Sequence, residues 1–152
     1  MFNKETEYAL RSLVYIQVQN FKGRKPGVDE ISCETAAPRF FVAKILHRMV
    51  KAGYLGSIKG KGGGFFFDAG KPSVPVRDLI ISIEGDRTIT GCIFGLSNCD
   101  AANPCPMHQQ YAPIRDSIEN LLTSETINSL ALKYTWSVKD APGKINPVII
   151  NN

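Results

Sequence analysis

The sequence contains no long apolar run, and none of its apolar stretches approaches the roughly 20 residues that a membrane-spanning helix needs. No repeat with a period of about 20–50 residues is visible, which argues against a solenoid or a propeller. The first five residues are not followed by the apolar segment of a signal peptide. With 152 residues, we expect a cytoplasmic protein made of one domain, or of one domain with an appended arm, that makes no contact with a membrane.

The motifs of the common enzyme classes are also missing. Only two histidines are present, and the sequence has no Cys-x-x-Cys pair, no phosphate-binding loop after a strand and no serine-nucleophile motif. The glycine run at 62–64 lacks the following helix that a dinucleotide site requires. We therefore expect that the protein is not an enzyme. A small thiol-dependent enzyme and a basic protein-interaction module remain as less favoured alternatives.

The net charge of +4 is distributed unevenly along the chain. Residues 1–71 contain 12 Lys or Arg and 6 Asp or Glu, a net charge of +6, whereas residues 72–152 contain 6 and 8, a net charge of −2. A concentration of positive charge in one half is the electrostatic pattern expected for a surface that binds phosphates. The first half is therefore the candidate for contact with nucleic acid.

The segment 38–67 combines a helix with a glycine-rich hairpin. Residues 38–52 carry a helical pattern that begins at Pro38, which suits a first helical turn, and stops at Gly53, which can adopt a left-handed conformation. Strands are expected at 54–58 and 65–67, with a tip at 59–64 between them. A helix beside a basic hairpin is typical of a winged helix-turn-helix. The predicted fold is therefore mainly α with a small β-hairpin wing.

The predicted helix has an inner and an outer face. Phe41, Ile45 and Met49 recur every four residues and are expected in the core. Outer side chains of the helix are expected to face bases in a major groove, and the hairpin lysines are expected to reach phosphates or the minor groove. These candidate DNA-binding residues are Arg39, Phe40, Lys44, Lys59 and Lys61. Each element alone is more often a solvated helix or an ordinary hairpin, but together and in this order they favour DNA binding.

Two further helices bear on the function. A short helix from Val28 to about Glu34 carries Cys33, which we expect to be a small buried or half-buried residue. A longer helix from His108 to about Leu122 has a narrow apolar stripe. That stripe fits pairing with the same helix of a second subunit, or packing within one chain.

Three of the four cysteines lie in one loop without clear periodicity. Six residues separate Cys92 from Cys99, five separate Cys99 from Cys105, and His108 follows after two more. Three thiolates and an imidazole can hold a metal ion or an iron–sulfur cluster. Structural zinc sites more often show paired Cys-x-x-Cys knuckles. Three unrelated thiols on a mobile loop remain the alternative.

Five ordered segments resemble the Rrf2 family of bacterial transcription regulators. They are Tyr-Ala-Leu-Arg at 8–11, the stretch from Leu46 to Leu55, the basic-Gly-x-x-Gly-Gly-aromatic pattern at 59–65, the helix at 77–85, and the three cysteines. The resemblance extends from about Lys4 to Leu132. It implies a homodimer that reads a pseudo-palindromic site in double-stranded DNA. The implied parts are a DNA-binding domain at 1–85, a cysteine-containing sensor loop at 86–107 and a dimerisation helix region at 108–135, followed by an extended tail at 136–152.

The resemblance also implies that Cys92, Cys99 and Cys105 bind an iron–sulfur cluster. His108 stands where some cluster-binding members have a histidine ligand, and Glu7 stands where nitric-oxide-sensing members supply a carboxylate from the partner subunit. The family usually has five residues between the first two cysteines, whereas this chain has six. A [2Fe–2S] cluster is favoured, and a [4Fe–4S] cluster remains open. The alternative is a winged-helix regulator without a cluster, which senses through thiol oxidation or zinc.

Overall fold

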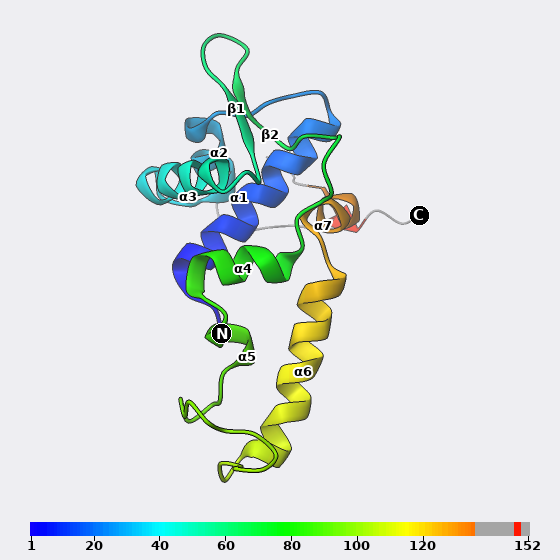
Figure 1. Cartoon of the computed structure of the whole chain (residues 1–152). Coiled ribbons are helices and arrows are strands. Elements are labelled where there is room, and N and C mark those ends of the chain that lie inside the picture. Colours follow the sequence, from blue (N-terminus) through cyan, green and yellow to red (C-terminus); the bar gives the residue numbers. More distant parts are fainter. Residues whose placement is uncertain (136–147, 150–152) are drawn as a thin grey trace.

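A computed structural model of the chain describes residues 1–135 and 148–149 (Figure 1). Its elements are α1 (Lys4–Phe21), α2 (Val28–Thr35), α3 (Arg39–Lys51), β1 (Gly56–Ile58), β2 (Gly64–Phe66), α4 (Val76–Glu84), α5 (Arg87–Thr90), α6 (His108–Ser124), α7 (Ile127–Lys133), β3 (Tyr134–Thr135) and β4 (Val148–Ile149). The predicted fold, mainly α with a small hairpin, is confirmed. The expected extended tail at 136–152 lies outside the described residues except for β4, which pairs with β3 in antiparallel orientation. Within the described ranges, no helix combines the length and the apolar character needed to cross a membrane.

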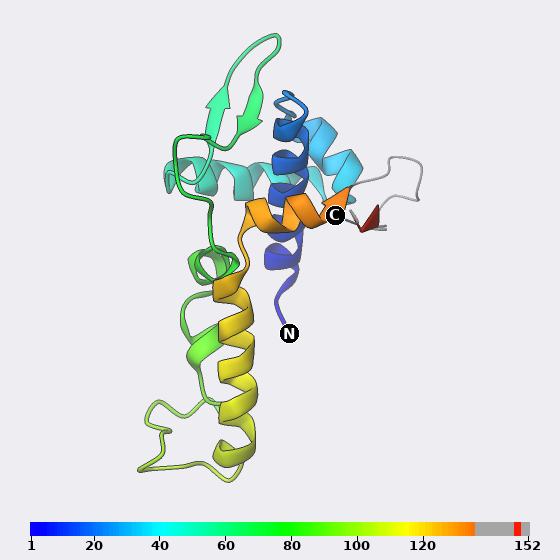
Figure 2. The same ribbon diagram turned by 90° about the vertical axis from the view of Figure 1, so that its right-hand side faces the viewer.

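The helix α1 runs through the winged-helix part of the molecule, and α2, α3, α4, α7 and β2 pack against it (Figures 1 and 2). Asn3 caps its N-terminus, because its Oδ1 accepts a hydrogen bond from the backbone N–H of Thr6 at 2.8 Å. The main core joins apolar side chains of α1, α2, α3, α4 and α7, among them Leu13, Ile16, Ile31, Ile45, Met49, Leu79 and Ile127. This core holds the helix-turn-helix of α2 and α3 rigidly against α1.

The helix α3 buries Val42, Ile45, Leu46 and Met49. The prediction for Ile45 and Met49 is confirmed, whereas the prediction that Phe41 faces the core is wrong, because this side chain is 38% exposed. A spacing of four residues drifts by about 40° per step around a helix with 3.6 residues per turn. Phe41 therefore rotates out of the core, where its ring contacts that of Tyr8 at a centroid distance of 5.7 Å.

The prediction that Cys33 is buried or half-buried is also wrong, because its side chain is exposed. The helix α2 turns Ile31 and Thr35 into the core. Cys33 lies about 200° around the helix from Ile31, on the opposite side. The short length of α2 left only one inward face, and the cysteine is not on it.

The wing is the antiparallel hairpin of β1 and β2, in which Gly56 pairs with Phe66 and Ile58 pairs with Gly64. Gly64 lies directly against the loop before α2: a Cβ atom at this position would be 2.1 Å from the carbonyl oxygen of Lys25. A larger residue at this position would therefore push the wing away from the body. The close approach lets the N–H of Phe65 donate to the carbonyl oxygen of Pro26 at 2.9 Å.

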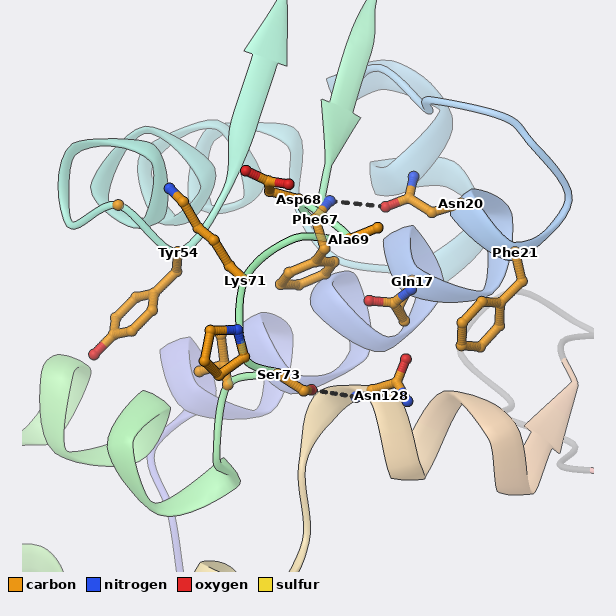
Figure 3. Close-up of a pocket in the computed structure, with 13 residues that line it drawn as sticks. Gln17, Asn20, Phe21, Tyr54, Phe67, Asp68, Ala69, Lys71, Ser73 and Asn128 are labelled. Carbon is orange, nitrogen blue, oxygen red and sulfur yellow. Dashed lines mark hydrogen bonds between the residues drawn. The ribbon is translucent and has the colours of Figure 1, made fainter.

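Asn20, near the end of α1, fastens the base of the wing. Its side-chain amide donates to the carbonyl oxygens of Arg24 at 2.8 Å and Phe65 at 3.3 Å. Its Oδ1 accepts a hydrogen bond from the N–H of Phe67 at 2.9 Å (Figure 3). One side chain therefore holds both the basic loop before α2 and the second strand of the wing.

Figure 3 shows a pocket between the end of α1, the segment after β2 and the start of α7. Its volume is about 460 Å³. The Phe67–Asn20 hydrogen bond lies at one side of it, and at another the N–H of Asn128 donates to Oγ of Ser73 at 3.1 Å. The segment that follows the wing is thus tied to α1 and to α7.

We expect Asn20→Ala to lower the free energy of unfolding by about 1–3 kcal/mol, because it leaves backbone groups of the wing without their partner. Chemical denaturation measures this change. Gln17→Ala is the matched control, since Gln17 lines the same pocket from the same helix and makes no hydrogen bond among the described side chains. Equal losses in the two variants would show that Asn20 does not hold the wing.

A second part of the molecule extends away from the winged helix. Val76 and Ile80 of α4, Ile89 of α5 and Leu122 of α6 form a separate small core. The long helix α6 carries the cysteine loop at its far end, so that the loop and the tip of the wing lie at opposite ends of the molecule (Figures 1 and 2). The short helix α5 was not predicted from the sequence.

Candidate nucleic-acid interface and thiol cluster

The outer face of α3 presents an aromatic side chain flanked by positive charge. Phe40 is 74% exposed, and its ring meets that of Phe41 edge-on at a centroid distance of 5.8 Å. Arg39 is exposed and forms an ion pair with Asp29 of α2 at 2.5 Å. Exposed ion pairs contribute little to stability, so this arginine can exchange its carboxylate for a phosphate or a base edge at small cost.

Two further cations of α3 share one carboxylate on α1. Oε1 of Glu5 lies 3.1 Å from Nη1 of Arg48 and 3.8 Å from Nζ of Lys44. This oxygen is buried and accepts no hydrogen bond of good geometry from the residues that the structure describes. Glu5 therefore attracts the side chains of Arg48 and Lys44 electrostatically, without a hydrogen bond that would fix their positions. Lys44 was predicted to lie on the outer face, whereas no sequence pattern singled out Glu5 or Arg48.

The tip of the wing carries Lys59 and Lys61, both exposed and without an ion pair in the part of the chain that the structure describes. At the base of the wing, Nζ of Lys25 lies 5.6 Å from the centre of the Phe66 ring, a cation–π contact. The wing thus adds free positive charge beyond the end of the helix-turn-helix. Lys25 was recognised from the sequence only as part of a basic turn.

The three cysteines of the loop converge at the far end of the molecule. Their sulfur atoms all lie within 4.8 Å of one another, and Sγ of Cys92 is 3.6 Å from Sγ of Cys105. Cys105 is buried, while Cys92 and Cys99 are half-buried. The chain between them thus folds so that sulfurs separated by many residues share one small space.

The loop is shaped by hydrogen bonds rather than by a core. The guanidinium group of Arg87 on α5 donates to the carbonyl oxygens of Gly95 at 3.2 Å and Leu96 at 3.3 Å. Oδ1 of Asp100 accepts the N–H groups of Ala102 and Asn103, both at 2.8 Å, which closes a tight turn between Cys99 and Cys105. The sequence offered no pattern that would single out Arg87, because its role depends on where the loop folds back.

The two candidate fourth ligands lie in different places. Nδ1 of His108, at the start of α6, is 3.2 Å from Sγ of Cys99. Glu7, in the first turn of α1, forms an ion pair with Lys4 at 2.7 Å and is not among the residues that gather with the cysteines within this chain. His108 is therefore close to the sulfur of Cys99 but does not join the group of three sulfurs, whereas Glu7 would need a second protomer to reach them.

The surroundings of the thiols affect their protonation differently. Burial raises the pKa of Cys92, but the N–H groups of Phe94 and Leu96 and the neighbouring thiols outweigh it, and bring the pKa to about 7. For Cys99, the N–H of Cys105 lowers the pKa, while burial and the neighbouring thiols raise it more, so that it stands above its ordinary value. Cys92 thus becomes a thiolate, the form that binds metals, more readily than Cys99 does.

The donor set fits a centre that prefers sulfur ligands. In a tetrahedral site with metal–sulfur bonds of about 2.3 Å, two sulfurs lie about 3.8 Å apart. The separation of 3.6 Å between Cys92 and Cys105 is close to that value. Thiolates with a nearby imidazole are ligands of iron–sulfur clusters and of zinc. The geometry admits both kinds of centre.

Comparison with known proteins gives one family for nearly the whole chain. The family model Rrf2, described as "Iron-dependent Transcriptional regulator", matches residues 2–133. A protein of Aquifex aeolicus described as an HTH-type transcriptional regulator is 30% identical over 132 residues, which are 86% of this chain and 90% of that protein. The HTH-type transcriptional regulator IscR of Escherichia coli K12 is 23% identical over 123 residues, 81% of this chain and 75% of that protein.

Solved structures share the fold at low sequence identity. The cysteine regulator CymR of B. subtilis superposes with a TM-score of 0.69 at 19% identity, over 86% of this chain and 95% of that one. IscR of T. potens superposes with a TM-score of 0.64 at 18% identity, over 86% of this chain and 85% of that one. At these identities the likeness concerns the fold, and the site has to be judged from the residues of this chain.

Proposed function

Because the chain belongs to the Rrf2 family of transcriptional regulators, we propose that it binds double-stranded DNA with an affinity controlled by an iron–sulfur cluster on Cys92, Cys99 and Cys105. The protein is a transcriptional regulator and not an enzyme. The observation that carries the proposal is the convergence of three sulfurs from a long loop within 4.8 Å of one another. No apolar core in the loop accounts for that convergence.

The proposed DNA contacts follow from the exposed charges. Arg39, Phe40 and Lys44 face the major groove, where Phe40 offers an apolar contact to a thymine methyl group. Lys59 and Lys61 reach phosphates or the minor groove from the wing. Two such surfaces, one from each protomer of a homodimer, match the two half-sites of a pseudo-palindromic operator.

The apolar stripe of α6 supports the homodimer. Ile114 is 57% exposed and Leu121 is 59% exposed, and with Pro113, Ser117 and Ile118 they line a shallow apolar hollow on the helix surface. Exposed apolar side chains in one row are typical of a helix that pairs with a partner.

We place the regulator in the cytoplasm, where bacterial DNA is found.

The cluster would be held by the three cysteines together with a fourth ligand. His108 is favoured because Nδ1 already lies 3.2 Å from Sγ of Cys99, and Glu7 of a second protomer is the alternative. A bound cluster supplies a charge that changes with its redox state and is lost with iron. A [2Fe–2S] cluster is favoured, and a [4Fe–4S] cluster remains open. Arg87 fixes the part of the loop that follows Cys92, through its hydrogen bonds to the carbonyl oxygens of Gly95 and Leu96.

A second function is favoured by the short distance between two sulfurs. Sγ of Cys92 and Sγ of Cys105 are 3.6 Å apart, and a disulfide needs about 2.05 Å, so a small movement would let oxidation join them. In this alternative the protein regulates DNA binding through thiol oxidation, or through zinc, without a cluster.

Anaerobic purification separates the two functions. We expect coloured protein with iron and sulfide bound, and a DNA affinity that differs between the iron-loaded and the iron-free forms when both are measured by gel shift. Protein that stays colourless and free of iron after reconstitution would contradict the cluster. Zinc analysis and mass spectrometry of oxidised samples would then identify zinc or the disulfide.

Removing one charge from the wing tests the DNA surface. We expect Lys59→Ala to weaken binding to all DNA sequences alike and to reduce the slope of log affinity against log salt by about 1. Fluorescence anisotropy over a salt series measures this slope. Lys133→Ala on α7 is the matched control, because Lys133 pairs with Glu125 on another part of the surface. An unchanged slope for Lys59→Ala would refute the wing assignment.

A further inference from the structure

Glu84 lies where the cysteine loop and the DNA-reading part of the molecule meet. It is the last residue of α4, and a carboxylate at a helix C-terminus is unfavourable for its own helix. Its hydrogen-bond partners at the start of α1 explain why a carboxylate is found at this position. Oε1 accepts hydrogen bonds from the N–H of Asn3 at 2.8 Å and from Oγ1 of Thr6 at 2.5 Å. A negative charge at the N-terminus of α1 is favourable for that helix.

The second carboxylate oxygen of Glu84 faces α5. Its Oε2 accepts a hydrogen bond from Oγ1 of Thr88 on α5 at 3.3 Å. The neighbouring residue Arg87 holds the carbonyl oxygens of Gly95 and Leu96 in the cysteine loop. One carboxylate therefore connects the short helix that anchors the loop to the start of α1.

The start of α1 is in turn connected to the reading helix. Glu5, one residue before the buried Thr6, lies 3.1 Å from Nη1 of Arg48 and 3.8 Å from Nζ of Lys44. A shift of the first turn of α1 would move this carboxylate relative to both cations of α3. The polar contacts thus run from the cysteine loop through α5, Glu84 and α1 to α3.

We propose that Glu84 is a positioning residue that couples the state of the cysteine loop to the placement of the charged side chains on α3. The inference rests on the proposed function, since it concerns how the same sensor loop acts on DNA binding. The hydrogen-bond partners of Glu84 among the described residues are Asn3, Thr6 and Thr88, and none of the sulfurs is among them. It acts by holding α5 and the first turn of α1 together, so that a displacement of one is passed to the other.

A hydrogen-exchange cycle on the metal-free, full-length protein tests this coupling. Arg87→Gln releases the loop, and the readout is the exchange rate of amides in the first turn of α1. In the native background we expect Arg87→Gln to accelerate that exchange by about 2- to 30-fold. In a Glu84→Met background, exchange should already be faster, and Arg87→Gln should add no further change.

Matched variants separate coupling from a general loss of structure. Glu84→Gln keeps one accepting oxygen for Asn3 and Thr6, and its amide N–H can donate to Oγ1 of Thr88, so this variant should retain the response of α1 to Arg87→Gln. Ser82→Ala on the same helix should leave it unchanged, because the hydroxyl of Ser82 bonds, among the described residues, only to the carbonyl oxygen of Leu79. If Glu84→Met does not fold, Thr88→Val removes the α5 contact alone and should abolish the response in the same way. No response of α1 to Arg87→Gln, or an equal response in both backgrounds, would overturn the proposal.

DNA binding then distinguishes this inference from the proposed function. If iron-loaded and iron-free wild-type protein differ in affinity, Glu84→Met should bring their ratio towards 1, whereas Glu84→Gln should keep it. A merely structural role would lower both affinities and leave the ratio in place, which contradicts the proposal. If the wild-type ratio is already 1, the proposed function fails, and the exchange cycle still decides whether Glu84 couples the loop to α1.

Discussion

Cys105→Ser is expected to abolish iron binding and to make DNA affinity independent of iron. Cys105 is the buried member of the three cysteines, and its sulfur lies 3.6 Å from that of Cys92. Loss of a partner that merely orients a metal ligand costs about 10- to 100-fold in metal affinity, so the loss of a ligand itself should cost at least that much. The measurements are iron per chain and visible absorbance after anaerobic reconstitution, followed by DNA binding with and without iron.

Cys33→Ser is the matched control for this experiment. It removes a thiol that is exposed on α2, remote from the other three, and should leave iron content and absorbance unchanged. Melting temperatures of both variants would show that neither substitution unfolds the chain. Full iron content in Cys105→Ser would exclude this thiol as a ligand and would favour a centre built from other residues.

The periodicity of apolar residues and the positions of glycine and proline made most of the fold predictable. Gly53 ends α3 with a left-handed φ of +82°, as expected, and the hairpin follows at the predicted place. The inward face of α3 was predicted only in part, because the four-residue spacing of Phe41, Ile45 and Met49 does not follow the true helical period. The clustering of the cysteines was suggested by their presence in one loop, but their convergence depends on contacts that no local pattern encodes.

Long-range polar contacts were the least predictable part of the molecule. Arg87 reaches across eight and nine positions to two backbone carbonyls, and Glu84 joins residues that are about 80 positions away in the sequence. Arg87 stands in no motif, and Glu84 lies in the segment 77–85 that resembles the family without being given a role by that resemblance, because an Arg or a Glu at a helix end is ordinary. Their roles follow from the packing of α4 and α5 against α1 and α6, which the sequence does not specify residue by residue.

Introducing two charges into the apolar stripe of α6, by Ile114→Asp and Leu121→Asp, should separate the proposed homodimer into monomers. Both side chains are more than half exposed in one protomer, so their substitution leaves the core intact. Burial of an Ile or Leu side chain contributes roughly 1.5–3 kcal/mol. Two such losses correspond to a dimer dissociation constant raised by about 100-fold or more. Sedimentation equilibrium over a range of concentrations measures the constant.

The same double variant should lose most of its affinity for a complete operator while keeping the weak affinity of one protomer for a half-site, because the link between the two reading helices is broken. Thr123→Asp is the matched control. It adds a negative charge at an exposed position of the same helix about 180° around from Ile114, and should leave the dimer intact. If the double variant remains dimeric, the stripe packs against something other than its own copy. The operator would then have to be read by a dimer joined elsewhere, since a winged helix from one protomer spans a single half-site.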